Sequence, residues 1–281
     1  MLPQNIDLHC HSNVSDGMLP PAEVVARAVA QGVTVLALTD HDDVAGLSEA
    51  RVAANELGLR LINGVEISVS WGTHTVHIVG LNIDPEHPVL AAGLATIRAG
   101  RSERAIKMAE QLAKAGVPDS LSGAYQHTGN PNLIGRMHFA RYLVAQGLVK
   151  DVRTVFKKYL VKGKPGYVSH QWADMADAVN WIRASGGQAV VAHPGRYQMG
   201  SAKMHELLEA FKAAGGEGIE VVTGSHTPEQ YPHFANLAQK FGLLSSRGSD
   251  FHAPGEGYRD IGRLPPLPEI CTPIWRDWNY Q

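Results

Sequence analysis

Short apolar runs alternate with longer amphipathic segments in the first third and the last third of the chain. The apolar runs predict strands at 6–8, 33–38, 60–69, 71–82, 188–192, 218–222 and 243–246. The segments between most of these runs predict helices near 20–31, 44–57, 174–185, 203–214 and 228–240. Because strands and helices alternate, the pattern indicates an α/β fold built on a parallel sheet.

The middle of the chain has a different pattern. Residues 88–165 are mostly helical in character, without strands between the helices, so we expect a helical subdomain inserted into the α/β domain. The α/β domain then consists of residues 1–87 and 166–281. A chain of 281 residues is long enough for one large α/β domain of this kind.

Polar side chains gather where the predicted strands end. This happens five times, at His9 and His11, Asp40 and His41, Glu66, His193, and Asp250 and His252. The carboxyl ends of parallel strands form one face of a barrel, and active sites are built on that face. An open sheet also binds ligands beyond its strand ends, but it would spread these residues along an edge. A barrel is therefore favoured, because it brings all of them to one site.

The first of these motifs, His9 and His11, places two possible metal ligands on the same side of a strand. Side chains alternate along a strand, so His9 and His11 point to one side while Cys10 points to the other, into packing. Two neighbouring imidazoles are half of a metal site. Asp16 follows in the turn that leaves the strand, and Gly17 allows that turn to be tight.

Composition disfavours several classes of protein. The 25 basic and 27 acidic side chains give a net charge of −2, so no strong overall field favours a long polyanion or a membrane surface. A small anion in a local pocket is compatible with this balance. Cys10 and Cys271 are the only cysteines, which argues against a disulfide framework and suits a reducing compartment. We see no signal peptide and no membrane span, and we expect a soluble cytoplasmic protein.

The side chains at the strand ends are imidazoles and carboxylates, without thiolates. Such ligands suit Zn²⁺, Mn²⁺ or Fe²⁺. At least nine candidates are present, and since a catalytic zinc takes three protein ligands, they suffice for two or three ions. Clustered metal ions activate water and stabilise both the attacking and the leaving oxygen of a phosphoryl transfer. The predicted reaction class is metal-assisted hydrolysis, most naturally of a phosphate ester.

Taken together, these motifs resemble the polymerase and histidinol phosphatase (PHP) family. The resemblance rests on His-x-His, Thr-Asp-His-Asp, a strand glutamate, Ala-His-Pro and Ser-Asp-x-His, and it covers residues 5–82 and 186–254. It implies a distorted seven-stranded β/α barrel of PHP type, with the helical insertion 88–165 lying over the active site. It also implies three divalent metal ions as cofactors, Mn²⁺ above all, with Fe²⁺ or Zn²⁺ as alternatives.

The resemblance further implies which residues hold each ion. The three sets are His9, His11, Glu66 and Asp250; Glu66, His77 and His193; and Asp16, His41 and His252. Glu66 thus bridges two ions. Asp16 stands where some members of the family have a histidine, a departure that would alter the affinity or the metal preference of the third site. Taken alone, His77 would also suit a hydrogen-bonded histidine in a strand.

Within the family, the chain is similar to stand-alone bacterial phosphoesterases that have a helical insertion. This similarity implies removal of the 3′-phosphate from 3′,5′-nucleoside bisphosphates, for example conversion of pAp to AMP, by a hydroxide that bridges metal ions. Either a metal ion or a general acid, with His193 and His138 as the candidates, would assist the leaving alkoxide. Three alternatives stay open: a 5′-to-3′ exoribonuclease on short RNA, a histidinol phosphatase, and a metal-binding module without activity, which the complete set of ligands disfavours.

The insertion is expected to supply the contacts to the nucleotide. Arg101 and Arg104 share one helix face, and Asn132 precedes an apolar helix as its expected N-cap. The first turn of that helix would favour anions, because its backbone N–H groups are free to bind them. The candidates for contacts to the substrate are Arg101, Arg104, Asn132, Arg136, His138 and Arg247, the last of which lies near Asp250.

Several of these candidates have a structural alternative. His138 would serve equally as a packed or capping group. The series Arg98, Arg101 and Arg104 would equally form a solvated face. Glu220 has no place in the ligand sets of the family, and we expect it to play a structural or ligand-supporting role.

Two further features bear on the size of the substrate. A basic run at Lys157, Lys158, Lys162 and Lys164 is either simply solvated or extends the anion site towards longer nucleic acid. Trp172 or Tyr167 would suit stacking on a base. The expected partner is a small nucleotide, with short RNA as the alternative.

Overall fold

The structure, a computed structural model, describes residues 5–256 and 259–278. Its strands are β1 (Ile6–Asp7), β2 (Val35–Leu38), β3 (Arg60–Trp71), β4 (His74–Leu81), β5 (Ala173–Asp174), β6 (Gln188–Val191), β7 (Gly218–Thr223) and β8 (Leu244–Gly248). The longer helices are α1 (Pro21–Ala30), α2 (Leu47–Leu57), α3 (Pro88–Lys114), α5 (Arg136–Ala145), α7 (Met175–Ala184), α8 (Ser201–Ala213) and α9 (Gln230–Phe241). Shorter ones are α4 (Ser120–Tyr125), α6 (Val152–Val155), the 3₁₀ turns η1 (Pro131–Leu133) and η3 (Pro194–Arg196), and the π-helix η2 (Phe156–Leu160).

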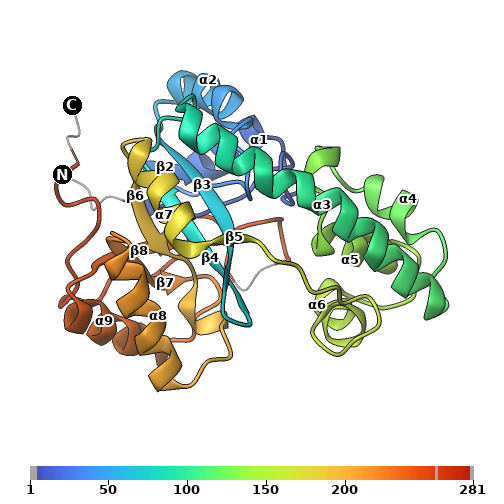
Figure 1. Cartoon of the computed structure of the whole chain (residues 1–281). Coiled ribbons are helices and arrows are strands. Elements are labelled where there is room, and N and C mark those ends of the chain that lie inside the picture. Colours follow the sequence, from blue (N-terminus) through green and yellow to red (C-terminus); the bar gives the residue numbers. More distant parts are fainter. Residues whose placement is uncertain (1–4, 257–258, 279–281) are drawn as a thin grey trace.

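Seven of the strands form a nearly closed barrel with helices outside it (Figure 1). Their order is β1-β2-β3-β4-β6-β7-β8, and β5 pairs with β3 off this path. The first strand meets the last at the closure. There the N–H of Leu8 donates to the carbonyl of Arg247, with 3.0 Å between nitrogen and oxygen, and Cys10 forms a parallel bridge with Phe251. The predicted seven-stranded β/α barrel is confirmed.

One strand departs from the predicted parallel sheet. β4 runs antiparallel to both β3 and β6, whereas the other pairs along the path are parallel. The connection explains this, because only Gly72 and Thr73 separate β3 from β4, and a parallel pair needs a crossover of a dozen or more residues. Gly72 has a φ of 57°, a conformation that glycine adopts without a steric penalty.

Apolar side chains fill and cover the barrel. β2 and β7 are buried along their whole length, as expected for strands that are covered on both faces. A small cluster of buried residues comes mainly from the strands, among them Leu8, Ala37 and Val190. The larger cluster joins the strands to α1, α2, α7, α8 and α9. This packing fixes the strand ends, and with them the side chains that follow each strand.

The helical insertion extends from one side of the barrel (Figure 1). α3 connects the two parts. Its first turns pack Leu90 and Leu94 against the core of the barrel, whereas Met108 and Leu112 belong to a separate core within the insertion. Phe139 on α5 is completely buried in that second core. The insertion is therefore held to the barrel by a long helix and has an apolar core of its own.

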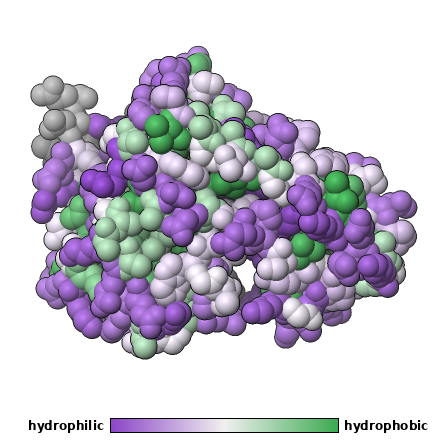
Figure 2. Space-filling view, in the orientation of Figure 1, coloured by the Kyte–Doolittle hydropathy of each residue, from purple (hydrophilic) through white to green (hydrophobic). Residues whose placement is uncertain are grey.

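Figure 2 shows one face of the molecule in space-filling form. Hydrophilic residues cover most of this face, and hydrophobic residues appear in separate small areas. An opening is visible between the insertion and the barrel. Within residues 5–256 and 259–278, no helix combines the length and the apolar character that crossing a membrane requires.

Candidate metal centre

The segment after β1 carries the first two imidazoles of the centre. The rings of His9 and His11 lie side by side, with 5.1 Å between their centroids. Cys10 faces the other way, and its Sγ contacts the carbonyl oxygen of Ala37 at 3.2 Å. The predicted alternation along this segment is confirmed.

Two glycines allow the chain to come close to these imidazoles. A Cβ atom at Gly17 would lie 2.5 Å from the backbone oxygen of His11. A Cβ atom at Gly248, the last residue of β8, would lie 2.2 Å from the Cβ of His9. Both distances are too short for real carbon atoms, so a larger residue at either position would push the loop or the strand away from the centre.

Glu66 lies at the middle of the centre and is completely buried in β3. Its Oε1 lies 2.8 Å from Nδ1 of His77 and 2.9 Å from Nε2 of His193. Its Oε2 lies 3.0 Å from Nδ1 of His41, and 3.3 Å from Nε2 of both His9 and His11. Five imidazoles from four parts of the chain thus converge on one carboxylate.

The later strands contribute residues in conformations that are uncommon outside glycine. His193 follows β6 with a φ of 26°, and Asp250 follows β8 with a φ of 55°. Such strain is often found at functional sites, where the surrounding structure holds it in place. The result is that Oδ1 of Asp250 lies 3.4 Å from Nε2 of His11. Nearby, Nε2 of His252 lies 3.2 Å from Oδ1 of Asp16.

The possible ligand atoms form three overlapping groups, and within each group all atoms lie within 4.8 Å of one another. The groups are His9, His11, Glu66 and Asp250; His11, Asp16, His41 and His252; and His41, Glu66 and His77. The first group contains the four residues that the sequence predicts. The second adds His11 to the predicted set, and the third has His41 where the prediction has His193. His193 nevertheless touches the same oxygen of Glu66 as His77 does.

The donor set fits divalent metal ions. Six imidazoles and three carboxylates converge here, a mixture that suits borderline or hard divalent cations. Three buried carboxylate oxygens accept no well-directed hydrogen bond in the described part of the chain, although imidazole nitrogens lie 3.0–3.4 Å from them: Oδ1 of Asp16, Oε2 of Glu66 and Oδ1 of Asp250. Buried carboxylate oxygens are normally paired or bound to metal. These atoms are therefore available to coordinate cations.

Electrostatics in the centre favour charged carboxylates. Burial would raise the pKa of Glu66, but the nearby His41, His77 and His9 outweigh burial and hold this pKa well below its usual range. Burial would likewise lower the pKa of His252, yet Asp16 raises it to about 9. Cations are thus strongly stabilised at this place, whether protons on the imidazoles or metal ions between the ligands.

Glu220 on β7 supports two of these ligands from behind. Its Oε1 lies 2.9 Å from Nδ1 of His9, so this nitrogen donates and Nε2 of His9 is left free to face the other ligands. Its Oε2 accepts the backbone N–H of His193 at 2.5 Å. A carboxylate that orients a metal-binding imidazole in this way is a common supporting element of metal sites. The expected ligand-supporting role of Glu220 agrees with this geometry.

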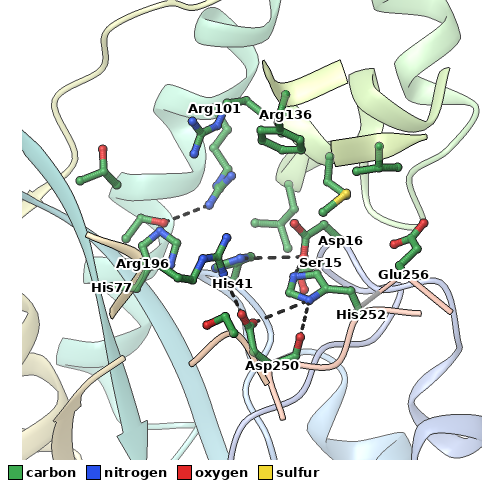
Figure 3. A pocket seen from close by; sticks show the side chains of 18 of the residues that line it. Ser15, Asp16, His41, His77, Arg101, Arg136, Arg196, Asp250, His252 and Glu256 are labelled. Carbon is green, nitrogen blue, oxygen red and sulfur yellow. Dashed lines mark hydrogen bonds and ion pairs between the residues drawn. The ribbon is translucent and has the colours of Figure 1, made fainter. Parts of the chain in front are cut away.

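A cavity of about 300 Å³ borders the centre (Figure 3). Asp16, His41, His77, Asp250 and His252 lie on one side of it. Figure 3 shows Arg101 and Arg136 across the cavity from Asp250 and His252, and Arg104, Phe156 and Trp172 also line it. The cavity therefore combines a metal-binding side with a cationic and aromatic side.

The arginines on the cationic side are held in an unusual environment. Burial, and then Arg136 and Arg101, lower the pKa of Arg104 to about 9. The guanidinium groups of Arg101 and Arg104 lie 4.8 and 5.2 Å from the ring centroid of Trp172. Arg101 also pairs with Asp42. The solvated face considered for these arginines is wrong for Arg101 and Arg104, since both residues are buried.

Arg196 lines the cavity but is not among the residues that the sequence predicts to contact the substrate. Arg196 belongs to η3, directly after the Ala-His-Pro motif, and its Nη1 donates to Oδ2 of Asp250 at 2.7 Å. Figure 3 shows its side chain among the ligands, beside His41 and His77. The available signal was its place three residues after His193, but a single arginine in a loop does not reveal where it points.

Three of the residues expected to contact substrate lie elsewhere. Asn132 is exposed within η1 and is not an N-cap of α5: Asn130 caps η1 by accepting the N–H of Asn132, and Gly135 precedes α5. Arg247 points away from the cavity and donates to the carbonyl of Leu264 at 3.1 Å. His138 is buried, with its Nδ1 accepting the N–H of Gly135 and its Nε2 facing the carbonyl of Ser15.

Comparisons with known proteins agree with this arrangement. The sequence pattern of the PHP domain matches residues 7–221. A 3′,5′-nucleoside bisphosphate phosphatase of Chromobacterium violaceum is 58% identical over 273 residues, which are 97% of this chain and 96% of that protein. A 5′-3′ exoribonuclease of Haemophilus influenzae is 45% identical over 269 residues, which are 96% of this chain and 97% of that protein.

A solved structure shows the same fold. An amidohydrolase from Chromobacterium violaceum with bound sulfate is 58% identical, with a TM-score of 0.95 over 97% of this chain and 95% of that one. The resemblance drawn from the five motifs is thereby confirmed by sequence and by structure. The chain belongs to the PHP domain family.

Proposed function

We propose that this protein is a metal-dependent phosphatase that removes the 3′-phosphate from 3′,5′-nucleoside bisphosphates such as pAp. Its class as a hydrolase of phosphoesters follows from its relatives, one named a phosphatase and the other an exoribonuclease. The choice of a nucleoside bisphosphate rests on the phosphatase, which at 58% identity is the more similar of the two.

One observation of the structure carries the proposal. The cavity beside the ligand groups is lined by Arg104 and Arg136, and within the described ranges neither guanidinium forms an ion pair with a carboxylate. A buried cation without a carboxylate partner costs free energy, so the buried Arg104, with the half-buried Arg136 nearby, indicates that the natural ligand is an anion. A molecule with two phosphates suits a cavity with one metal-binding side and one arginine side.

We assign three divalent ions to the centre, with Mn²⁺ as the preferred ion. The assigned ligands are His9, His11, Asp16, His41, Glu66, His77, His193, Asp250 and His252. When bound, such ions lower the pKa of bound water and offset the charge that develops on the phosphoryl oxygens. The chain itself contributes Nε2 of His9, which Glu220 orients, and the carboxylate of Glu66, which reaches two groups of ligands.

The arginines position the substrate. Arg104 and Arg136 are assigned to the phosphate that is not cleaved, because they lie across the cavity from the ligands. Arg196, which pairs with Asp250, is assigned to the phosphate that reacts. Guanidinium groups bind phosphate oxygens in a bidentate manner, which fixes both position and orientation. The exposed Asn132 and the distant Arg247 have no part in this arrangement.

Neither candidate for the general acid is favoured as a charged imidazolium at neutral pH. Burial, together with Arg196, lowers the pKa of His193 to about 3, and burial lowers the pKa of His138 to about 4. We therefore assign His193 to the ligand group around Glu66, and we assign His138 to the support of the loop that carries Asp16. The proton for the leaving alkoxide is assigned to solvent.

A second candidate function is exoribonuclease activity on short oligonucleotides. It is favoured by the relative of that name, to which this chain is 45% identical over nearly its whole length. The same centre would hydrolyse a phosphodiester, because in both reactions water attacks phosphorus and an alkoxide leaves; the diester differs in carrying a second esterified oxygen on the phosphorus. The substrate that is turned over faster then depends on what lies outside the cavity.

A comparison of substrates tests the proposal. Phosphate release or chain cleavage is measured, with Mn²⁺ present, on adenosine 3′,5′-bisphosphate, on a 5′-phosphorylated pentaribonucleotide and on histidinol phosphate. We expect the bisphosphate to be hydrolysed with the highest kcat/KM and histidinol phosphate to be hydrolysed at least 100-fold less well. Faster turnover of histidinol phosphate, or no release from the bisphosphate, would overturn the proposal.

A further inference from the structure

The basic run of the insertion lies on a segment that borders the cavity. We call residues 152–168 the basic arm; it includes α6 and the π-helix η2. Its five basic residues are Arg153, Lys157, Lys158, Lys162 and Lys164, and it contains no aspartate or glutamate. This concentration of positive charge stands out in a chain whose net charge is −2.

Both ends of the basic arm touch the cationic side of the cavity. Near its start, Phe156 lines the cavity, and the guanidinium of Arg136 lies 5.7 Å from the centroid of its ring. At its end, the carbonyl of Val168 accepts a hydrogen bond from Nε of Arg104 at 3.4 Å. The lysines therefore lie on a segment whose two ends border the site that we assign to phosphate.

The fold of the basic arm keeps these lysines in solvent. Val155 and Leu160 are buried in the core of the insertion, and the chain then reverses through a hydrogen bond from the N–H of Gly166 to the carbonyl of Tyr159. Lys157 and Lys158 lie in η2, and single-turn π-helices are frequent at functional sites. Apolar anchors thus hold a turn whose exposed side chains are cationic.

The four lysines have no counter-charge of their own. All four are exposed, and across residues 5–256 and 259–278 none of their ammonium groups forms an ion pair with a carboxylate. Two exposed lysines elsewhere do have acidic partners: Lys107 pairs with Glu103 on α3, and Lys203 pairs with Glu206 on α8. The anion that complements the basic arm is therefore external to the described chain.

From this arrangement of charge we propose that the basic arm binds the backbone phosphates of an oligonucleotide whose terminal nucleotide occupies the cavity. The inference rests on the proposed phosphate site, and it adds a second surface that a single nucleotide does not reach. Single-stranded nucleic acid carries one phosphate per nucleotide, and lysines that track such a backbone give affinity without sequence preference. The protein would therefore hold short RNA more tightly than it holds a nucleoside bisphosphate.

Two matched variants of the whole protein test this inference. The first carries Lys157→Gln, Lys158→Gln, Lys162→Gln and Lys164→Gln in the basic arm. The control carries Lys107→Gln, Lys114→Gln, Lys203→Gln and Lys240→Gln, four exposed lysines on α3, α8 and α9 that give the same change in net charge. Binding of a 5′-phosphorylated, 3′-labelled pentaribonucleotide is measured by fluorescence anisotropy over a series of salt concentrations, and hydrolysis of adenosine 3′,5′-bisphosphate is measured in parallel.

We expect the arm variant to bind the pentaribonucleotide at least 10-fold more weakly than the control. The slope of log Kd against log salt should become shallower by about 0.7 for each lysine that touches a phosphate. Hydrolysis of the bisphosphate should change less than 2-fold in both variants. Equal binding of the pentaribonucleotide by the arm variant and the control would overturn the inference.

Failure of the proposed function gives a different pattern. If the wild-type protein releases no phosphate from the bisphosphate, while binding of the pentaribonucleotide still depends on the four arm lysines, then the cavity has been assigned the wrong substrate and the basic arm keeps its role. If the bisphosphate is hydrolysed and the arm lysines make no difference to binding, the inference about the arm alone is lost.

Discussion

Nε2 of His138 lies 3.1 Å from the backbone carbonyl oxygen of Ser15, and this contact ties α5 of the insertion to the loop that carries Asp16. Nδ1 of the same ring accepts the N–H of Gly135 at 3.0 Å. Both nitrogens of the imidazole are therefore used within the protein. The insertion supports one group of ligands through this ring, although the ring itself does not line the cavity.

Replacement of His138 by alanine should loosen that support. His138→Ala leaves a buried N–H and a buried carbonyl without partners, and each loss costs about 1–3 kcal/mol. We expect a lower unfolding temperature and, at limiting Mn²⁺, loss of the ion that Asp16 helps to hold. Thermal unfolding and metal analysis measure the two effects, with the exposed His233→Ala as control. Unchanged metal content in His138→Ala would show that Asp16 does not depend on the insertion.

Glu220 offers a test of how the ligands are oriented. In Glu220→Gln one carboxylate oxygen becomes an NH₂ group that faces either Nδ1–H of His9 or the N–H of His193, so a donor meets a donor. Loss of such a supporting contact typically lowers metal affinity or activity by about 10–100-fold. We expect Glu220→Gln to show this loss when its activity is measured over a series of Mn²⁺ concentrations. The exposed Glu103→Gln on α3 should match the wild type, and equal titrations for Glu220→Gln and Glu103→Gln would contradict the assigned role.

Replacement of Arg104 by methionine should weaken substrate binding but raise the unfolding temperature. Arg104→Met removes a contact to phosphate, and hydrogen bonds to charged groups are worth about 1.5–3 kcal/mol, so KM for the bisphosphate should rise roughly 10–100-fold. The same change removes a buried cation whose pKa is lowered by burial and by Arg136 and Arg101. The protein without substrate should therefore unfold at a temperature about 2 °C higher.

The conservative variant Arg104→Lys separates these effects, because it keeps the charge and loses only the planar guanidinium. It should show a smaller rise in KM and no gain in stability. The opposite result would be a lower unfolding temperature for Arg104→Met that does not change when phosphate is added. It would mean that Arg104 is a packing residue rather than a ligand for anions.

Burial of His226 should make the free energy of unfolding depend on pH. It is buried beside Phe234, its Nδ1 lies 3.0 Å from the carbonyl of Val221, and its Nε2 accepts the N–H of Gly195. Burial lowers its pKa from 6.5 to about 4. Between these two values the unfolded chain binds a proton that the folded protein does not. The folded state should therefore lose about 3 kcal/mol as the pH falls from 6.5 to 4, and nothing from this residue above pH 6.5.

The variant His226→Gln isolates this contribution, since glutamine does not titrate. Denaturant unfolding at a series of pH values gives the difference in stability between the wild type and the variant. This difference should be constant above pH 6.5 and should shift in favour of the variant towards pH 4. A difference that does not vary with pH would mean that the His226 ring is not held neutral by burial.

Most of the ligands could be predicted from the sequence because they lie within or shortly after an apolar strand, whereas the place of Asp16 in a ligand set came from the family resemblance. His9, Glu66 and Asp250 are far apart in the chain, but parallel strands with short polar ends leave few places where such ends can meet. The barrel followed from the same pattern. Its one antiparallel strand, β4, was missed because the prediction rested on the alternation of strands and helices and did not weigh the short connection between β3 and β4, which is too short for a parallel pair.

The contacts to substrate were harder to predict because they depend on side-chain direction. Arg247 lies only three residues before Asp250, yet it points to the outside of the barrel towards Leu264. Asn132 was expected to cap the next helix, but the 3₁₀ turn η1 is capped by Asn130, and α5 begins only at Arg136. Arg196 was missed because the strained turn at His193 decides its direction, and a sequence does not show that strain.

The central claim is that the side chains around Glu66 hold divalent ions on which hydrolysis depends. The most direct measurement is a Mn²⁺ titration of chelator-treated wild type and of Glu66→Gln, in which bound metal and phosphate release from adenosine 3′,5′-bisphosphate are followed together. We predict that wild type without metal releases no phosphate and regains activity as Mn²⁺ binds, while Glu66→Gln binds less Mn²⁺ and stays at least 100-fold less active. Full phosphate release by metal-free wild type, or full activity of Glu66→Gln, would contradict the account.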